Sequence, residues 1–105
     1  MSEHDYSIIT TGDYKRTLVR GFLAVASFDS STGVLFTCVA EYIPLDAMRL
    51  LLGPYIDESR AASAKELFEH AQRLRDFSGY CSGVSQQVMR ETSASLSQLA
   101  GKLLL

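Results

Sequence analysis

The hydrophobic positions of this 105-residue chain change their spacing near its middle. Before Pro44, apolar and β-branched residues alternate with polar ones or run together, as they do in strands. After Asp57 they recur at steps of three and four residues, which is the spacing of an amphipathic helix. The pattern therefore predicts an α+β domain, with strands in the first part of the chain and helices in the second.

The clearest strand signal is a pair of runs, 22–28 (FLAVASF) and 34–43 (VLFTCVAEYI), which flank the turn-prone residues 29–33. Gly33 supplies the positive φ that a type I turn with a bulge requires. These features predict an antiparallel β-hairpin. On its second strand one face is the more apolar, and we expect the helices to cover it; this face consists of Val34, Phe36, Cys38, Ala40 and Tyr42.

The segment before this hairpin permits two interpretations. Residues 7–11 (SIITT) can form a further strand, with Gly12 and Asp13 in a type II′ turn, which would make a three-stranded meander. Alternatively, Asp13 caps a helix that extends through residues 14–28, and the domain is all-α. The polar residues 1–6 are expected to form a flexible tail before a single domain of residues 7–105.

Three helices are predicted in the second part of the chain. The first follows Pro44, which suits a first helical turn, and it ends at Gly53 and Pro54. The second spans about 60–77 and the third about 84–103, and their short connection predicts an antiparallel pair. Each carries an apolar stripe, formed by Ala64, Leu67, Phe68, Ala71, Leu74 and Phe77 in the second helix and by Val84, Val88, Leu96, Leu99 and Leu103 in the third.

More apolar side chains are present than one face of each element can cover. Leu45, Met48 and Leu52 form a stripe that suits the domain's own core, but neighbouring leucines point elsewhere around the same helix. The chain also ends in three leucines. Because exposed apolar patches mark interaction sites, we expect a protein interface, and a homodimer, formed by Leu50, Leu51, Leu52, Tyr55, Ile56, Leu103, Leu104 and Leu105.

Charge and composition exclude several classes of protein. The formal net charge is −2, whereas a nucleic-acid binder normally carries a basic excess, so no nucleic-acid partner is expected. Lys15, Arg16 and Arg20 form the only basic cluster, and we interpret it as a solvated edge. No apolar run approaches the length that spans a bilayer, and the first residues lack a signal-peptide pattern. A cytoplasmic protein is expected.

No motif for catalysis, a cofactor or a metal ion is present. His70, Cys38 and Cys81 are widely separated in the sequence and have no ligand spacing. We therefore expect no catalytic, cofactor-binding or metal-binding residue, and a protein that is not an enzyme. The alternative is a small ligand-binding domain or enzyme with a pocket between hairpin and helices, lined by Phe36, Cys38 and Phe68.

The segment from Leu35 to Leu52, with the sequence IPLDAM opening a short helix before a helical pair, resembles small regulatory proteins of pseudomonad-type bacteria. In size and in its helical second half, the chain is similar to the antiactivators that sequester quorum-sensing transcription regulators. The resemblance covers under half of the chain. It implies a homodimer that binds a transcription regulator and blocks its dimerisation or its contact with DNA.

Overall fold

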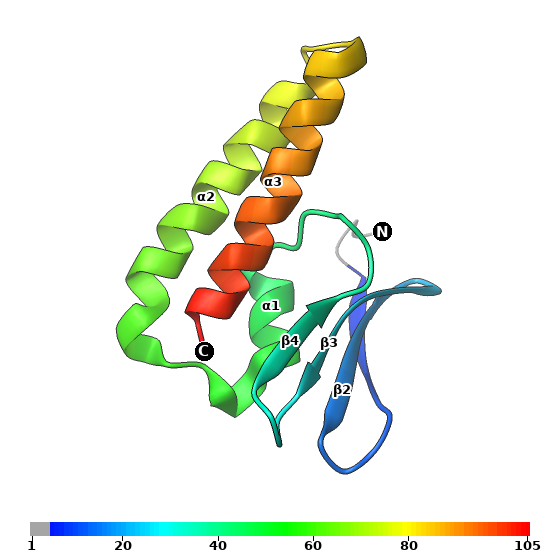
Figure 1. Cartoon of the computed structure of the whole chain (residues 1–105), viewed down its shortest axis with the longest axis vertical. Coiled ribbons are helices and arrows are strands. Elements are labelled where there is room, and N and C mark those ends of the chain that lie inside the picture. Colours follow the sequence, from blue (N-terminus) through cyan, green and yellow to red (C-terminus); the bar gives the residue numbers. More distant parts are fainter. Residues whose placement is uncertain (1–4) are drawn as a thin grey trace.

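The computed structural model describes residues 5–105 and places four strands before three helices (Figure 1). The α+β prediction is confirmed, and residues 14–28 contain strands, not a helix. The predicted tail falls partly on residues 1–4, which lie outside the described residues, and the first strand already begins at Tyr6. The strands are β1 (Tyr6–Thr10), β2 (Lys15–Arg20), β3 (Leu23–Asp29) and β4 (Val34–Thr37), and the helices are α1 (Leu45–Leu52), α2 (Ala61–Ser78) and α3 (Gly83–Leu103).

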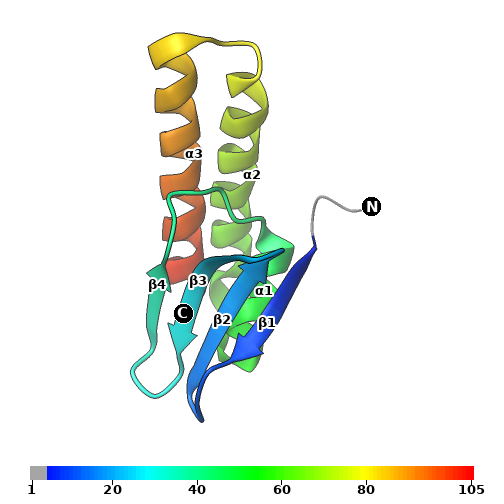
Figure 2. The same cartoon turned by 90° about the vertical axis from the view of Figure 1, so that its right-hand side faces the viewer.

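The four strands form one antiparallel sheet in the order β1-β2-β3-β4 (Figure 2). Arg20 pairs with Leu23, so Gly21 and Phe22 form a two-residue loop between β2 and β3. Gly21 has a φ of 63° and Phe22 has a negative φ, as a type II′ turn requires. The prediction of a type II′ turn at Gly12 and Asp13 is therefore wrong, because the two-residue turn lies at Gly21 and Phe22. This turn divides the segment 15–29 into two strands, so the sheet has four strands where three were predicted.

A β-bulge in β3 directs two consecutive side chains into the core. Leu18 pairs with Ala26 and Val19 with Ala24, so Val25 is the extra residue of the bulged strand. Val25 and Ala26 are both buried, although successive residues of a regular strand point to opposite faces. The bulge lets the sheet present more apolar surface to the helices than simple alternation predicts.

The prediction for the covered face of β4 is wrong. Leu35 is the buried residue of this strand, while Val34 and Phe36 are exposed. Leu35 pairs with Phe28, which lies in the core, and this register turns the neighbours of Leu35 to solvent. The strand also ends at Thr37, well before Pro44, so the expected alternation through residue 43 does not exist.

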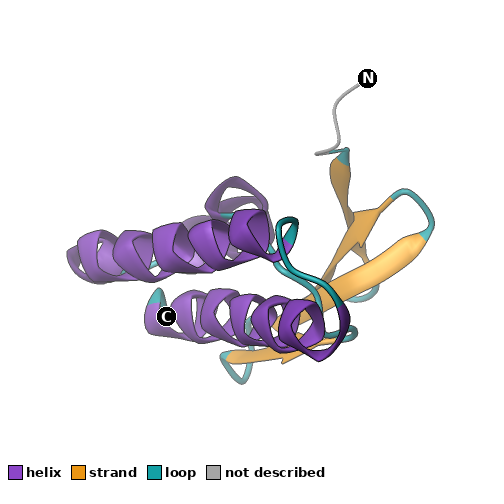
Figure 3. Ribbon diagram, turned by 90° about the horizontal axis from the view of Figure 1, so that it is seen from above, coloured by secondary structure: helices purple, strands orange, loops and turns teal. Residues whose placement is uncertain are grey.

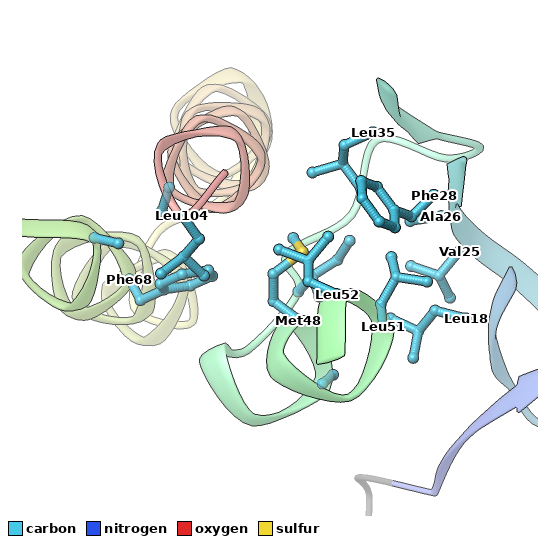
Figure 4. Packing of buried hydrophobic residues seen from close by; sticks show 14 residues of the cluster. Leu18, Val25, Ala26, Phe28, Leu35, Met48, Leu51, Leu52, Phe68 and Leu104 are labelled. Carbon is cyan, nitrogen blue, oxygen red and sulfur yellow. The ribbon is translucent and has the colours of Figure 1, made fainter. Parts of the chain in front are cut away.

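Helix α1 lies between the sheet and the pair formed by α2 and α3 (Figures 1 and 4). Figure 4 shows Leu51 among Leu18 and Val25 of the sheet, while Met48 and Leu52 lie toward Phe68 and Leu104 of the helix pair. The helix ends as predicted, with Gly53 at a φ of 56°. Because α1 has apolar neighbours on two sides, it buries far more than a single stripe.

The C-terminal leucines close this core. Leu104 is fully buried, and its carbonyl oxygen accepts a hydrogen bond of 2.7 Å from the backbone N–H of Asp57. Leu103 and Leu105 are half-buried and pack against the same cluster. The end of α3 is thereby fixed to the segment that enters α2.

Replacing Leu51 by Ala should destabilise the fold strongly, and the adjacent Leu50→Ala variant is its control. Leu51 is 0% exposed and Leu50 is 44% exposed. Loss of a buried leucine leaves a cavity, so we expect Leu51→Ala to lower the free energy of unfolding by about 2–5 kcal/mol. Leu50→Ala should lower it by about 1 kcal/mol or less. Urea titrations followed by circular dichroism will measure both, and equal losses would contradict the placement of α1.

Candidate functional site

The interface predicted from the sequence does not form one exposed surface. Leu51, Leu52 and Leu104 are fully buried in the domain's own core, so their assignment to an interface is wrong. The other predicted residues divide into half-buried ones that pack on the core, Ile56, Leu103 and Leu105, and exposed ones, Leu50 and Tyr55. The Tyr55 ring also packs on Phe28, with 5.6 Å between centroids. The surplus of leucines is absorbed because α1 is covered from two sides.

The contact between α2 and α3 consists largely of small side chains. On α2, Ala64, Ala71 and Ser78 are buried at intervals of seven residues. The buried side chains of α3 are also small, and they are Ser93, Ala94, Ser97, Ala100 and Gly101. Small side chains allow two helices to approach closely, and the Ser93 hydroxyl then donates a hydrogen bond of 2.5 Å to the carbonyl of Ala71.

One flank of α3 meets the rest of the domain through small residues as well. At about 100° per residue, Ala94 and Gly101 lie on the same side of α3. A Cβ at Gly101 would collide with the Met48 side chain and would lie 3.0 Å from Leu35. The Ser97 hydroxyl accepts a hydrogen bond of 3.1 Å from the Ile43 N–H. This flank therefore packs against α1, β4 and the segment that joins them.

Three large apolar side chains of α3 lie on the opposite flank. By the same helical geometry, Val88, Leu96 and Leu99 lie on the side of α3 away from Ala94 and Gly101. Val88 is 53% exposed and Leu99 56% exposed, while Leu96 is half-buried. The apolar stripe that the sequence predicts on α3 is real, but it is not the stripe that the domain buries.

Helix α2 continues this surface. Leu74 and Phe77 lie on the flank of α2 that adjoins Leu96, and Phe77 is 55% exposed. With Leu96 they line a shallow hollow of about 450 Å³, whose rim carries His70 and Arg73. We call this surface the outer helical face, and its residues are Leu74, Phe77, Val88, Leu96 and Leu99.

The two polar residues at the rim are in contact with each other. The Arg73 Nη2 atom is 2.8 Å from the His70 Nδ1 atom. This contact keeps the Arg73 guanidinium at the edge of the hollow, where its remaining N–H groups can donate to a ligand. Beyond the hollow, Tyr80 and Val84 are exposed at the end of the helix pair. That end extends past the sheet (Figure 1).

A second concave surface lies on the other side of α2. This groove, of about 530 Å³, is lined by residues of β1, α1, α2 and the segment before α1, among them Tyr6, Tyr42, Leu50, Phe68 and Arg75. Burial raises the pKa of the phenols of Tyr6 and Tyr42, so both stay protonated at neutral pH and can donate hydrogen bonds. The Arg75 guanidinium lies 5.5 Å from the centre of the Tyr42 ring. The groove is therefore amphipathic.

This groove is not the pocket that the sequence predicted. Of the three expected lining residues only Phe68 contributes to it, while Phe36 and Cys38 are exposed elsewhere. No local sequence pattern marks Tyr6 and Tyr42 as neighbours, because only the tertiary fold brings β1 and the segment before α1 to one groove. A pocket of this volume is within the range of ligand sites.

The remaining candidate features are metal ligands, a membrane-spanning helix and the basic cluster. Within residues 5–105, no three His, Cys, Asp or Glu side chains gather where they could hold a metal ion. In the same part of the chain, no helix is long and apolar enough to cross a membrane. Two members of the basic cluster are occupied, because Arg16 donates to the Leu50 carbonyl at 2.9 Å and Arg20 pairs with Glu41.

Replacing Ser93 by Leu should disrupt the helix pair, and Ser95→Leu is its control on the same helix. Ser93 is fully buried against α2, and Ser95 is exposed. Overpacking should lower the free energy of unfolding of Ser93→Leu by about 1–3 kcal/mol, whereas Ser95→Leu should stay within about 0.5 kcal/mol of the original chain. Chemical denaturation will compare the two, and a neutral Ser93→Leu would contradict the close helix contact.

Comparisons of this chain with protein-family models, with curated proteins and with solved structures found no match. The resemblance to antiactivators therefore stays a prediction from the sequence. What the protein does has to be argued from its surfaces, and the outer helical face gathers exposed large apolar side chains from two helices.

Proposed function

We propose that the protein is a non-enzymatic interaction module that binds another protein through the outer helical face and restrains it. One observation carries this proposal: the buried residues of α3 are all small, while its Val88 and Leu99 are exposed. A helix whose only task is to complete a core normally buries its large apolar stripe. An exposed apolar stripe costs solubility, and covering it in a complex removes that cost.

The shape of the face fits a helix of the partner. The hollow lies between two antiparallel helices and is lined by Leu74, Phe77 and Leu96. A partner helix can place apolar side chains at three- and four-residue steps into such a hollow. Arg73 and His70 at the rim favour a carboxylate on the partner, since a guanidinium binds carboxylates with particular strength.

The kind of partner that we propose is a transcription regulator in the cytoplasm. The resemblance to antiactivators implies it, and two features of the chain are compatible with it. The net charge of −2 supplies no general electrostatic attraction to DNA, which is compatible with a protein that acts on the regulator and not on the promoter. Binding to a helix that the regulator needs for its own dimerisation would be sufficient to inhibit it.

The proposal is tested by placing a charge in the face. Leu99→Glu should weaken partner binding by at least about tenfold, because a carboxylate would be buried in an apolar contact. The matched control is Leu50→Glu, which charges a similarly exposed leucine outside the face. Pull-downs from extract of the native cell will identify a protein that the original chain retains, and calorimetry with that purified protein will measure both variants.

The two variants also define the contrary result. If Leu99→Glu binds the identified protein as tightly as the original chain does, the outer helical face is not the binding surface. If Leu50→Glu alone loses binding, the surface lies beside the groove that Leu50 lines. Circular dichroism and thermal melting of both variants will show that each remains folded.

A second candidate function is the binding of a small ligand in the groove between α1 and α2. Its volume of about 530 Å³ and its mixture of phenols, apolar side chains and Arg75 favour it. Nuclear magnetic resonance with a fragment library should then shift the signals of Tyr6 and Tyr42 specifically. Fragments that perturb only the outer helical face would reject this candidate and leave the first in place.

A further inference from the structure

The outer edge of β1 offers a set of backbone hydrogen-bonding groups. The Thr11 N–H donates to the Lys15 carbonyl at 3.0 Å, so these two residues form a hydrogen-bonded pair of the β1–β2 hairpin. Hydrogen-bonded and non-hydrogen-bonded pairs alternate along antiparallel strands. The backbone groups of Ser7 and Ile9 therefore point to β2, and those of Tyr6, Ile8 and Thr10 point away from it.

These outward groups have no backbone partner among residues 5–105, where β1 is the last strand of the sheet (Figure 2). Natural proteins normally protect such an edge with a charged residue, a proline or a bulge. The sequence of β1 is Tyr-Ser-Ile-Ile-Thr, which contains no charge and no proline, and its pairing with β2 is regular. The edge therefore has the properties of a strand that pairs with another strand.

We propose that β1 pairs with β1 of a second copy of this chain, antiparallel and with Ile8 on the two-fold axis. In this register Ile8 faces Ile8 of the other copy, and Tyr6 faces Thr10. All three outward residues are then members of hydrogen-bonded pairs, which gives about six main-chain hydrogen bonds across the axis. The two sheets become one continuous sheet, and neither copy retains this open edge.

A second copy fits this edge because the strand is complementary to itself. The centre of the outward set, Ile8, is also the middle residue of β1, so a two-fold rotation superimposes the set on itself. No charged side chain of one β1 faces a like charge of the other, a situation that would destabilise the pair. The two Ile8 side chains, which pack at the margin of each core, would extend the two cores toward each other.

This inference does not rest on the proposed function. The edge of β1 and the outer helical face are separate surfaces, since they belong to the sheet and to the two long helices, and the strands lie to one side of these helices (Figure 3). A dimer through β1 therefore leaves the outer helical face free, and each surface can be tested with the other intact.

The test is the mass of the protein in solution, with two proline variants compared. One chain has a mass of 11.6 kDa, so sedimentation equilibrium should give twice that mass at high concentration. Thr10→Pro removes an outward N–H and should yield monomers, because proline cannot donate and its ring obstructs the neighbouring strand. Thr10 is exposed and does not donate to β2, so the hairpin itself should persist.

Thr37→Pro is the matched control on the opposite edge of the sheet. The Cys38 N–H donates to the Val25 carbonyl at 2.8 Å, which by the same alternation turns the N–H of Thr37 away from β3. This variant makes the same chemical change at an edge that the proposal leaves unpaired. It should remain a dimer, and circular dichroism will confirm that both variants are folded.

Charge pairs at the axis provide a second measurement. Ile8→Lys and Ile8→Glu should each be monomeric, because each would oppose like charges directly across the axis. An equimolar mixture of the two should form a heterodimer. A lysine at this edge can extend its ammonium group to solvent, so the fold tolerates the change.

Three results would overturn the proposal. The first is a monomer at every concentration, and the second is a dimer that Thr10→Pro leaves intact. The third is a dimer that Leu99→Glu dissociates while Thr10→Pro does not, which would place the contact on the outer helical face. Loss of the dimer in Thr10→Pro with unchanged partner binding would support the β1 contact and leave the proposed function standing.

Discussion

The domain depends on the burial of α1 from two sides. Leu51 packs against the sheet, and Met48 and Leu52 pack toward α2 and α3, so this short helix joins two layers that otherwise meet mainly where α3 contacts β4. Each of these three side chains is fully buried. Without α1 the sheet would expose its apolar face to water and lose the hydrophobic stabilisation that its burial supplies.

The two flanks of the helix pair differ in the size of their apolar side chains. One flank reaches α1 through Ala94 and Gly101, and the contact between the helices uses small residues such as Ala71 and Ser93, which permit a close approach and a hydroxyl-to-carbonyl hydrogen bond. Close packing of small side chains supplies dispersion energy in place of large apolar area. The exposed Val88 and Leu99 of α3 therefore contribute little to the core, and this leaves the outer helical face free.

The sequence predicts the fold class, the helix pair and the end of α1 at Gly53, because periodicity and glycine are local signals. The sequence pattern predicts the wrong buried faces for α3, α1 and β4. Ser97 and Gly101 carry almost no hydrophobic signal, so the buried flank of α3 is invisible to a pattern of apolar residues. The sequence pattern assigns Leu51 to an interface because one stripe of a helix is enough for an ordinary core, and only the tertiary arrangement shows that α1 has two covering layers. Register, which decides between Leu35 and Phe36 on β4, is likewise a property of the pairing with β3.

The two proposed surfaces have a joint consequence for binding strength. A dimer formed at β1 carries two outer helical faces, one on each helix pair, and each face lies beyond α1 as seen from the shared sheet. A partner that presents two binding helices could engage both faces at once. The second contact is then intramolecular, so the affinity of the assembly can exceed that of one face without any additional contact. A single face of modest affinity, built from a few exposed residues such as Phe77 and Leu99, would then be sufficient to sequester such a partner.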